Sequence, residues 1–241
     1  MQMTRSTRQQ LAAGSEAAPS GAASAFLRTI VYVDGFNLYN RLLKNSPHKW
    51  LDLKSLASTL LNPSNKITAV NYYTSGVSGK IDPSVPIRQN CYIRALEGHI
   101  PGLRIHRGKF YTKSAMRPRS RRLPSGKWDY VEIMHTAEKG SDVNLAAHLL
   151  RDAFTNAFDT ALVTSQDTDL TEPVRIAVQD GKKAVGVASP ERVPEGLKEV
   201  ASFSRHIHRG FLKQCQMPKS VTGKNGQQIH KPPVWDNPYG Y

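Results

Sequence analysis

Three places in the sequence put aspartates where a strand or a helix could carry them to one site. Asp34 follows the apolar, β-branched residues 30–33, and Asp167 and Asp169 follow a second apolar run, residues 159–165. Such runs are typical of strands that are buried on both faces of a parallel sheet. Because open α/β sheets bind ligands at the carboxyl ends of their strands, we expect these three carboxylates to lie at one edge.

A fourth aspartate, Asp142, lies near the start of the strongest helical segment of the sequence, residues 137–154. An acid at a helix start often only caps the helix, and a pair such as Asp34-Gly35 often only makes a turn. Capping alone does not explain four carboxylates at one site, because they repel one another unless they share a cation. Oxygen ligands favour Mg²⁺ or Mn²⁺, whereas Zn²⁺ is disfavoured because no Cys or His accompanies the acids.

A divalent ion held by these acids would fit the hydrolysis of phosphodiester bonds. It would lower the pKa of a bound water and offset the charge on phosphate oxygens. Asn37, one helical step beyond Asp34, could hold a phosphate oxygen or a metal-bound water. Lys139 is a candidate contact to a substrate phosphate. Candidate hydrogen-bond donors behind the acids are the hydroxyls of Ser141, Thr164 and Ser165.

The composition favours a polyanionic partner. The 241 residues include 33 Lys and Arg against 19 Asp and Glu, a net charge of +14. Nine of these cations lie between residues 104 and 127 with no acid among them, and such a block repels itself unless an anion is present. The candidate nucleic-acid contacts are Arg107, Lys109, Lys113, Arg117, Arg119, Arg121, Arg122, Lys127 and Lys139. The flanking aromatics Phe110, Tyr111, Trp128 and Tyr130 are either core residues or platforms for unpaired bases.

Strand and helix patterns alternate along the chain, which predicts an α/β fold with a mostly parallel central sheet. We expect strands near residues 30–33, 66–74, 103–111, 128–134, 159–165, 182–188 and 204–208. The expected helices cover residues 36–43, 51–61, 87–99, 137–154, 172–180 and 194–202. The third and fourth strands should form an antiparallel excursion, joined by a long cationic loop.

The composition also divides the chain into three parts. Residues 1–27 are rich in Ala, Ser, Gly and Pro, which is typical of a disordered segment and not of a secretory signal. Residues 28–208 form the predicted domain, with a basic insertion at about 104–127, and residues 209–241 form a basic, Pro-containing extended tail. Two cysteines give no disulfide framework, and no apolar run is long enough for a membrane span. We therefore expect a cytoplasmic protein with no membrane partner.

Three short segments resemble the signature motifs of the NYN domain family, which comprises PIN-like metal-dependent ribonucleases and includes the LabA-like group. They are Val-Asp-Gly-Phe-Asn-Leu at 33–38, Glu-Lys-Gly-Ser-Asp-Val at 138–143 and Thr-Ser-Gln-Asp-Thr-Asp at 164–169. The resemblance covers residues 27–208. It implies a PIN-like three-layer α/β/α sandwich and an acidic Mg²⁺ or Mn²⁺ site. The residues implied are Asp34, Asp142, Asp167 and Asp169, with Asn37 beside them.

The third motif departs from the family pattern. Gln166 and Leu170 stand where the family usually has glycine and phenylalanine. Residues 167–171 also match the DxDxT motif of haloacid-dehalogenase-like phosphatases, but that motif normally opens its domain, and no second acid pair follows here.

The sequence thus predicts a nuclease that uses Mg²⁺ or Mn²⁺, with RNA as the preferred partner. The alternative is a nucleic-acid-binding PIN-like module with weak or no catalysis, acting within a larger complex. Substrate sequence, endo- or exonuclease mode and assembly into a homo-oligomer stay open at this point.

Overall fold

The computed structural model describes residues 26–80 and 82–236, and it has a seven-stranded sheet at its centre in the order β4-β3-β2-β1-β5-β6-β7. β4 runs antiparallel to β3, and every other neighbouring pair is parallel. The strands are β1 (Leu27–Asp34), β2 (Asn65–Ser75), β3 (Leu103–Arg122), β4 (Trp128–Lys139), β5 (Thr160–Thr164), β6 (Ala184–Ser189) and β7 (Phe203–His206). The predicted α/β class is therefore confirmed. Of the segment expected to be disordered, residues 1–27, residues 1–25 lie outside the described part of the chain.

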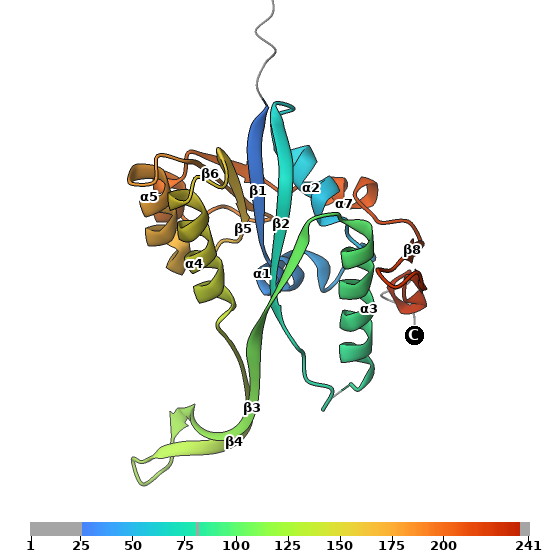
Figure 1. Ribbon diagram of the computed structural model, residues 1–241. Coiled ribbons are helices and arrows are strands. Elements are labelled where there is room, and N and C mark those ends of the chain that lie inside the picture. The colour runs from blue at the N-terminus through green and yellow to red at the C-terminus, as the bar shows by residue number, and fades with distance from the viewer. Residues whose placement is uncertain (1–25, 81, 237–241) are drawn as a thin grey trace, which may run out of the picture.

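Helices cover both faces of the sheet, as Figure 1 shows. One face carries α1 (Gly35–Leu38), a π-helical turn η1 (Tyr39–Leu43), α2 (Leu53–Leu60) and α3 (Ser84–His99). The other carries α4 (Ser141–Phe154), α5 (Thr171–Gln179) and α6 (Glu195–Val200), with a 3₁₀ turn η2 (Thr168–Leu170) before α5. In the described residues, no helix is both long and apolar enough to cross a membrane.

Alternation along β1 explains why the sheet is buried from both sides. Val31 and Val33 belong to the hydrophobic core under α1, α2 and α3, while Ile30 and Tyr32 belong to the core under α4, α5 and α6. Successive side chains of a strand point to opposite faces, so a run of apolar residues joins two helical layers. The predicted three-layer α/β/α sandwich is confirmed.

The predicted antiparallel pairing of the third and fourth strands at the basic insertion is confirmed, but the predicted connection between them is not. The long cationic loop is wrong, because β3 continues to Arg122 and β4 starts at Trp128, so residues 123–127 alone connect them. The two strands pair in antiparallel register from Lys109 opposite Lys139 outward. Figure 1 shows that this β-ribbon extends away from the body of the domain. An exposed ribbon buries little apolar surface, so the outer part of β3, residues 112–122, lacks the hydrophobic pattern by which strands are recognised.

The predicted extended tail is also wrong for its described part, residues 209–236. This part forms α7 (Arg209–Gln214), the hairpin β8 (Ser220–Thr222) and β9 (Gln228–His230), and a 3₁₀ turn η3 (Pro233–Trp235). Its buried side chains join the core under α2 and α3, and the Trp235 ring lies 6.0 Å from Trp50 and 6.2 Å from Tyr92 between centroids. In this segment, single apolar residues between cations and prolines pack on a surface that distant parts of the chain form. The segment has no hydrophobic pattern of its own for this reason.

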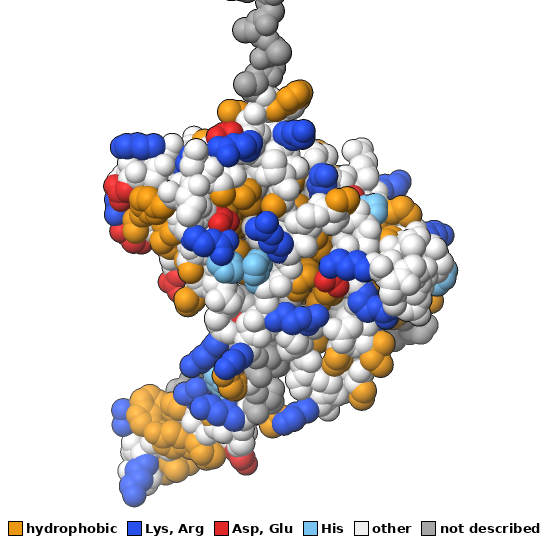
Figure 2. Space-filling view, in the orientation of Figure 1, with side chains coloured by type: hydrophobic (Ala, Val, Ile, Leu, Met, Phe, Trp, Pro, Cys, Tyr) orange, Lys and Arg blue, Asp and Glu red, His pale blue; other side chains and the backbone are white. Residues whose placement is uncertain are grey.

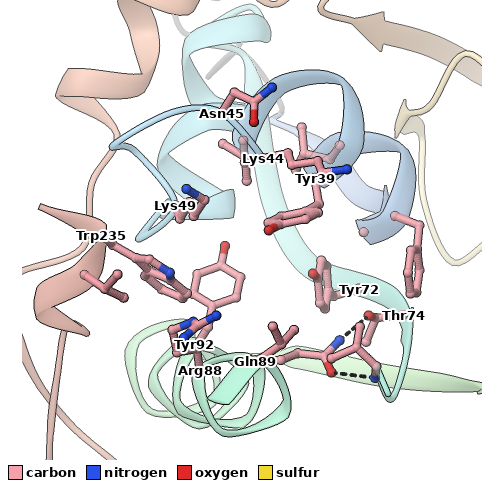
Figure 3. A pocket seen from close by; sticks show the side chains of 17 residues that line it. Tyr39, Lys44, Asn45, Lys49, Tyr72, Thr74, Arg88, Gln89, Tyr92 and Trp235 are labelled. Atoms are coloured by element: carbon pink, nitrogen blue, oxygen red, sulfur yellow. Dashed lines mark hydrogen bonds between the residues drawn. The ribbon is translucent and has the colours of Figure 1, made fainter. Parts of the chain in front are cut away.

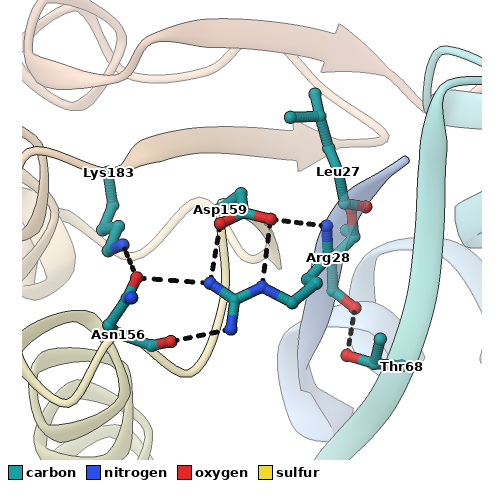
Figure 4. A network of polar contacts seen from close by, with 7 residues as sticks. Leu27, Arg28, Thr68, Asn156, Asp159 and Lys183 are labelled. Carbon is teal, nitrogen blue, oxygen red and sulfur yellow. Dashed lines mark hydrogen bonds and ion pairs between the residues drawn. The ribbon is translucent and has the colours of Figure 1, made fainter. Parts of the chain in front are cut away.

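A polar network closes the amino-terminal edge of the sheet (Figure 4). The guanidinium of Arg28 donates to both carboxylate oxygens of Asp159 at 2.7 and 3.1 Å, and to the main-chain oxygen of Asn156 at 3.0 Å. The hydrogen bonds from Arg28 lower the pKa of Asp159 to about 2. The network joins the start of β1 to the connection between α4 and β5.

We expect the Leu212→Ala variant to lower the free energy of unfolding by about 2–5 kcal/mol, because Leu212 on α7 is 1% exposed and its truncation leaves a cavity. Val234→Ala is the control, since Val234 is 53% exposed and should change stability by no more than about 0.5 kcal/mol. Denaturant unfolding of both variants measures the difference. Equal stability of the two would mean that the C-terminal segment is not part of the cooperative fold.

Candidate acidic site

Asp34 ends β1 and is 5% exposed at the carboxyl edge of the sheet. Its Oδ1 accepts from the main-chain N–H of Asn37 at 2.9 Å, and its Oδ2 accepts from Ser165 Oγ at 2.9 Å. The side chain of Asn37 is half-buried next to it. Burial raises the pKa of Asp34, and the two hydrogen bonds act against that rise. Its carboxylate is thus fixed in orientation and poorly hydrated.

Gly35 lets the chain turn at this point close to β2. A Cβ on Gly35 would lie 2.7 Å from the Tyr72 ring and 2.7 Å from the main-chain oxygen of Tyr73. A side chain would therefore push the first turn of α1 away from the sheet. The Asp-Gly pair makes a turn and also sets the distance between Asp34 and β2.

Ser165 connects the acid of β1 to those that follow β5. Its Oγ donates to Asp34 and accepts from the main-chain N–H of Asp167 at 3.1 Å. Asp167 Oδ1 in turn accepts from the N–H of Asp169 at 3.0 Å, which caps η2. The turn therefore uses one carboxylate oxygen of Asp167, whereas the carboxylate of Asp169 is exposed.

Asp142 does not cap α4. The first N–H of that helix and the hydroxyl of Ser141 both donate to Glu138 Oε1, at 3.1 and 2.6 Å, and Asp142 accepts no hydrogen bond from the described residues. Burial and like charge raise the pKa of Asp142 to about 6. The charges responsible belong to Asp34, Asp167, Glu138 and Asp169, which places all four predicted aspartates and Glu138 in one electrostatic neighbourhood.

Glu138 is a member of this group that the sequence reasoning missed. It lies in the second motif, but its carboxylate can lie beside the start of α4 only because Gly108 of β3, which faces that helix, has no side chain. A Cβ on Gly108 would lie 2.9 Å from Ser141 Oγ and 2.8 Å from the main-chain oxygen of Lys139. A glycine inside an otherwise alternating strand was the available signal of such a close approach.

The donor set fits a hard divalent cation in chemistry and in charge. No described Lys, Arg or His forms an ion pair with the four aspartates. At the carboxyl end of β2, the buried hydroxyl of Ser75 has no hydrogen-bond partner in the described part of the chain. Nevertheless, no three Asp, Glu, His or Cys side chains among residues 26–80 and 82–236 are placed to hold one ion. A cation would have to draw these carboxylates together.

The predicted donors behind the acids differ in position. Ser165 contacts Asp34, and Ser141 contacts Glu138, whereas Thr164 points to the opposite face of β5, with Leu162 and the core under α1. Gln166 Oε1 accepts from Ser189 at 2.6 Å, and its Nε2 donates to Glu191 at 3.1 Å. The side chain that replaces the family's glycine is therefore held toward the end of β6.

The β3–β4 ribbon separates its charges between two faces. Lys109, Lys113 and Arg117 alternate along one face, where Lys139 lies opposite Lys109 and His135 lies opposite Lys113. We call these five residues the cationic face. Glu132 and Glu138 lie on the other face, because they pair with the intervening residues of β3. All predicted nucleic-acid contacts are exposed, and Figure 2 shows Lys and Arg side chains gathered where the ribbon leaves the body.

The tip of the ribbon is less cationic than its sequence indicates. Arg121 and Arg119 lie 3.0 and 3.7 Å from Asp129, which the antiparallel return of β4 brings beside them. Arg122 lies over the ring of Trp128 at 4.4 Å. The side chains of Tyr111, Trp128 and Tyr130 are 47, 45 and 54% exposed, so the interpretation of these aromatics as core residues is wrong.

A cavity of about 390 Å³, which we call the aromatic pocket, lies on the α1 and α3 side of the sheet (Figure 3). Its aromatic walls are Tyr39, Tyr72, Tyr92 and Trp235, and its cations are Lys44, Lys49 and Arg88. Gly35 and Phe36, which follow Asp34 directly, form its border toward the acids. Sequence patterns could not indicate this pocket, because its walls come from α1, β2, α3 and the C-terminal segment.

The family model of the NYN domain matches residues 28–207, which include all three acidic motifs. The chain belongs to the NYN domain family. NYN domains are PIN-like nucleases, and the seven-stranded α/β/α sandwich of this chain agrees with that assignment.

A curated relative is 26% identical over 241 aligned residues, which cover 87% of this chain and 75% of the relative. It is named 6-hydroxy-3-succinoylpyridine 3-monooxygenase HspA, from Pseudomonas putida (strain DSM 28022 / S16). A similar solved structure is that of a protein of unknown function, VPA0982, from Vibrio parahaemolyticus RIMD 2210633. It is 14% identical with a TM-score of 0.46, and the match covers 78% of this chain and 97% of that one.

We expect Asp142→Asn to stabilise the metal-free protein at pH 7. The pKa of Asp142 is about 6 in the folded state against 3.8 for the free side chain, so its ionised form opposes folding at neutral pH. This penalty is absent well below pH 4, where the group is protonated in both states. It grows as pH rises from about 4 to about 6 and stays constant above that. Thermal unfolding in EDTA at pH 7 and pH 4 should show a gain for the variant that is much larger at pH 7 than at pH 4. A gain of the same size at both pH values would contradict the crowding of these carboxylates.

Proposed function

We propose that this NYN protein is a Mg²⁺- or Mn²⁺-dependent ribonuclease that hydrolyses phosphodiester bonds at the acidic site. The observation that carries the proposal is the gathering of four carboxylates around Asp142 without a paired cation, where burial and their like charge raise its pKa to about 6. In a protein that only bound nucleic acid, such a cluster would lower the affinity, because carboxylates repel phosphate. The membership in a PIN-like nuclease family supports the same reaction.

The proposed metal ligands are Asp34, Asp142, Asp167 and Asp169. A divalent ion held there would supply a water of lowered pKa and would offset charge on the phosphate. Asn37 N–H and Ser165 Oγ keep the carboxylate of Asp34 in a fixed orientation, so this ligand needs little rearrangement.

The side-chain amide of Asn37 is the proposed donor to a phosphate oxygen. Lys139 is the proposed contact to the flanking phosphate, since it ends β4 beside the start of α4.

The cationic face supports RNA as the partner. It presents alternating Lys and Arg side chains along an exposed ribbon, and exposed Tyr and Trp rings lie further out on the same ribbon. Cations that follow a backbone and aromatic rings that stack on bases are typical of proteins that bind single strands. Both cysteines are free, which supports a reducing, cytoplasmic location.

Labelled single-stranded RNA incubated with the protein should be cleaved when Mn²⁺ or Mg²⁺ is present and not in EDTA. We expect Asp34→Asn and Asp167→Asn each to slow cleavage by about 100-fold or more, because each removes a charge that would hold the ion. Asp180→Asn, the same change at an exposed position at the end of α5, should have no effect. Undiminished cleavage by Asp34→Asn would contradict the proposed site.

A related candidate is an RNA-binding NYN module that does not cleave. The observation that favours it is that no three ligating side chains in the described residues are placed to hold one ion. The same incubation separates the two candidates, because a binding module would retain RNA at every metal concentration without producing fragments.

A second candidate function is turnover of a small aromatic substrate, in line with the name of the monooxygenase relative. The observation that favours it is the aromatic pocket, which lies on the other face of the sheet from α4. Conversion of a substituted pyridine in the presence of dioxygen and a reductant, unaffected by Asp34→Asn, would support this candidate over the nuclease.

The ribbon gives a matched comparison for RNA binding. We expect Lys113→Ser with Arg117→Ser to weaken binding, because phosphates of the RNA would no longer be neutralised there. The slope of log affinity against log salt should fall by about 0.7 for each phosphate that is no longer neutralised. Arg119→Ser with Arg121→Ser removes the same charge but acts on residues that already pair with Asp129, so its effect should be smaller. Filter binding at a series of salt concentrations measures both slopes. A slope for Lys113→Ser with Arg117→Ser equal to that of the unchanged protein would remove the cationic face from the RNA path.

A further inference from the structure

We propose that the aromatic pocket binds one unpaired nucleotide of the RNA, with the base against its tyrosines and the phosphate against its cations. The identification of the ligand as RNA rests on the proposed function, but the binding itself needs neither the acidic site nor a metal ion.

The walls of the pocket are already formed for a planar ring. Tyr72, Tyr92 and Trp235 are 8, 7 and 9% exposed, and the ring of Tyr92 meets those of Tyr72 and Trp235 edge to face at 6.4 and 6.2 Å. The hydroxyl of Tyr92 donates to the main-chain oxygen of Leu51 at 2.8 Å, which fixes this central ring. Tyr39, 40% exposed, stands at the edge of the pocket, as Figure 3 shows. A base can therefore enter without rearrangement of the core.

The charge of the pocket selects an anion. Lys44, Lys49 and Arg88 line it, and no acidic residue does so in the described part of the chain. Lys49 donates to the main-chain oxygen of Ser46 at 3.0 Å, and Arg88 is held by Asp82 at 2.9 Å, so two of the cations have fixed positions. Burial and the charge of Arg88 lower the pKa of Lys49. A phosphate between Lys49 and Arg88 would relieve their repulsion.

The size of the pocket suits a ligand of this kind. Its volume of about 390 Å³ falls near the lower end of the range of roughly 300–1,000 Å³ that small-molecule sites occupy.

The position of the pocket favours a nucleotide of a longer strand over a free aromatic acid. Thr74 of β2 lines the pocket and pairs with Arg107 of β3, and Lys109 of the cationic face follows two residues later on the same side of the strand. On its other side, Gly35 and Phe36 separate the pocket from Asp34. The inner end of the cationic face thus lies next to the pocket, through Thr74, and next to the acids, through Lys139.

Titration calorimetry of the full chain in EDTA tests this proposal independently of cleavage, with adenosine 5′-monophosphate, adenosine and nicotinate as probes. We expect saturable binding of the monophosphate, weaker binding of adenosine, which lacks the phosphate, and the weakest binding of nicotinate, which offers less ring surface. Lys49→Gln with Arg88→Gln should weaken binding of the monophosphate by about 10-fold or more, and so should Tyr39→Ala, which is exposed enough to leave the fold intact.

Arg94→Gln is the matched control, because Arg94 is exposed on the same helix α3 and contacts Gln227 instead of the pocket. No binding of the monophosphate, or equal binding by the control and the pocket variants, would overturn the proposal. Tighter binding of nicotinate than of the monophosphate would overturn it in favour of a small aromatic acid. Because EDTA is present throughout, a failure of the nuclease proposal would leave these outcomes unchanged.

Discussion

Mutual repulsion among carboxylates is the constraint on which the acidic site depends. The sheet order puts β1 beside β5, so Asp34 and Asp167 emerge at one edge, and Ser165 joins them through its single hydroxyl. α4 then brings Asp142 toward the same edge, where its pKa rises to about 6. Such an arrangement opposes folding at neutral pH, and buried polar strain of this kind tends to mark functional sites.

The buried sheet and its acids could be predicted because the information is local. Parallel strands covered on both faces need continuous apolar runs, and the residue that follows such a run falls at the carboxyl edge. Asp34 and Asp167 are therefore recognisable without any knowledge of their partners. The fold class follows from the same alternation of strands and helices.

What could not be predicted depends on contacts between distant residues. The outer part of β3 lacks an apolar pattern because both faces of the ribbon are exposed. Asp129 pairs with Arg121 only because the chain returns antiparallel. Glu138 joins the acids only where Gly108 leaves space for it. Trp235 is one apolar residue in a polar segment, and its burial becomes evident only once Trp50 and Tyr92 are in place.

The position of the last described turn, η3, affects the order in which the acidic site and the aromatic pocket can form during synthesis. The strands of the sheet and all five acids precede residue 207, whereas Val234 and Trp235 of η3 close the aromatic pocket. During synthesis from the amino terminus, the residues of the acidic edge thus leave the ribosome first. About thirty further residues must follow before Val234 and Trp235 can close the aromatic pocket. A protein shortened from its carboxyl end would lack the pocket wall that Val234 and Trp235 provide.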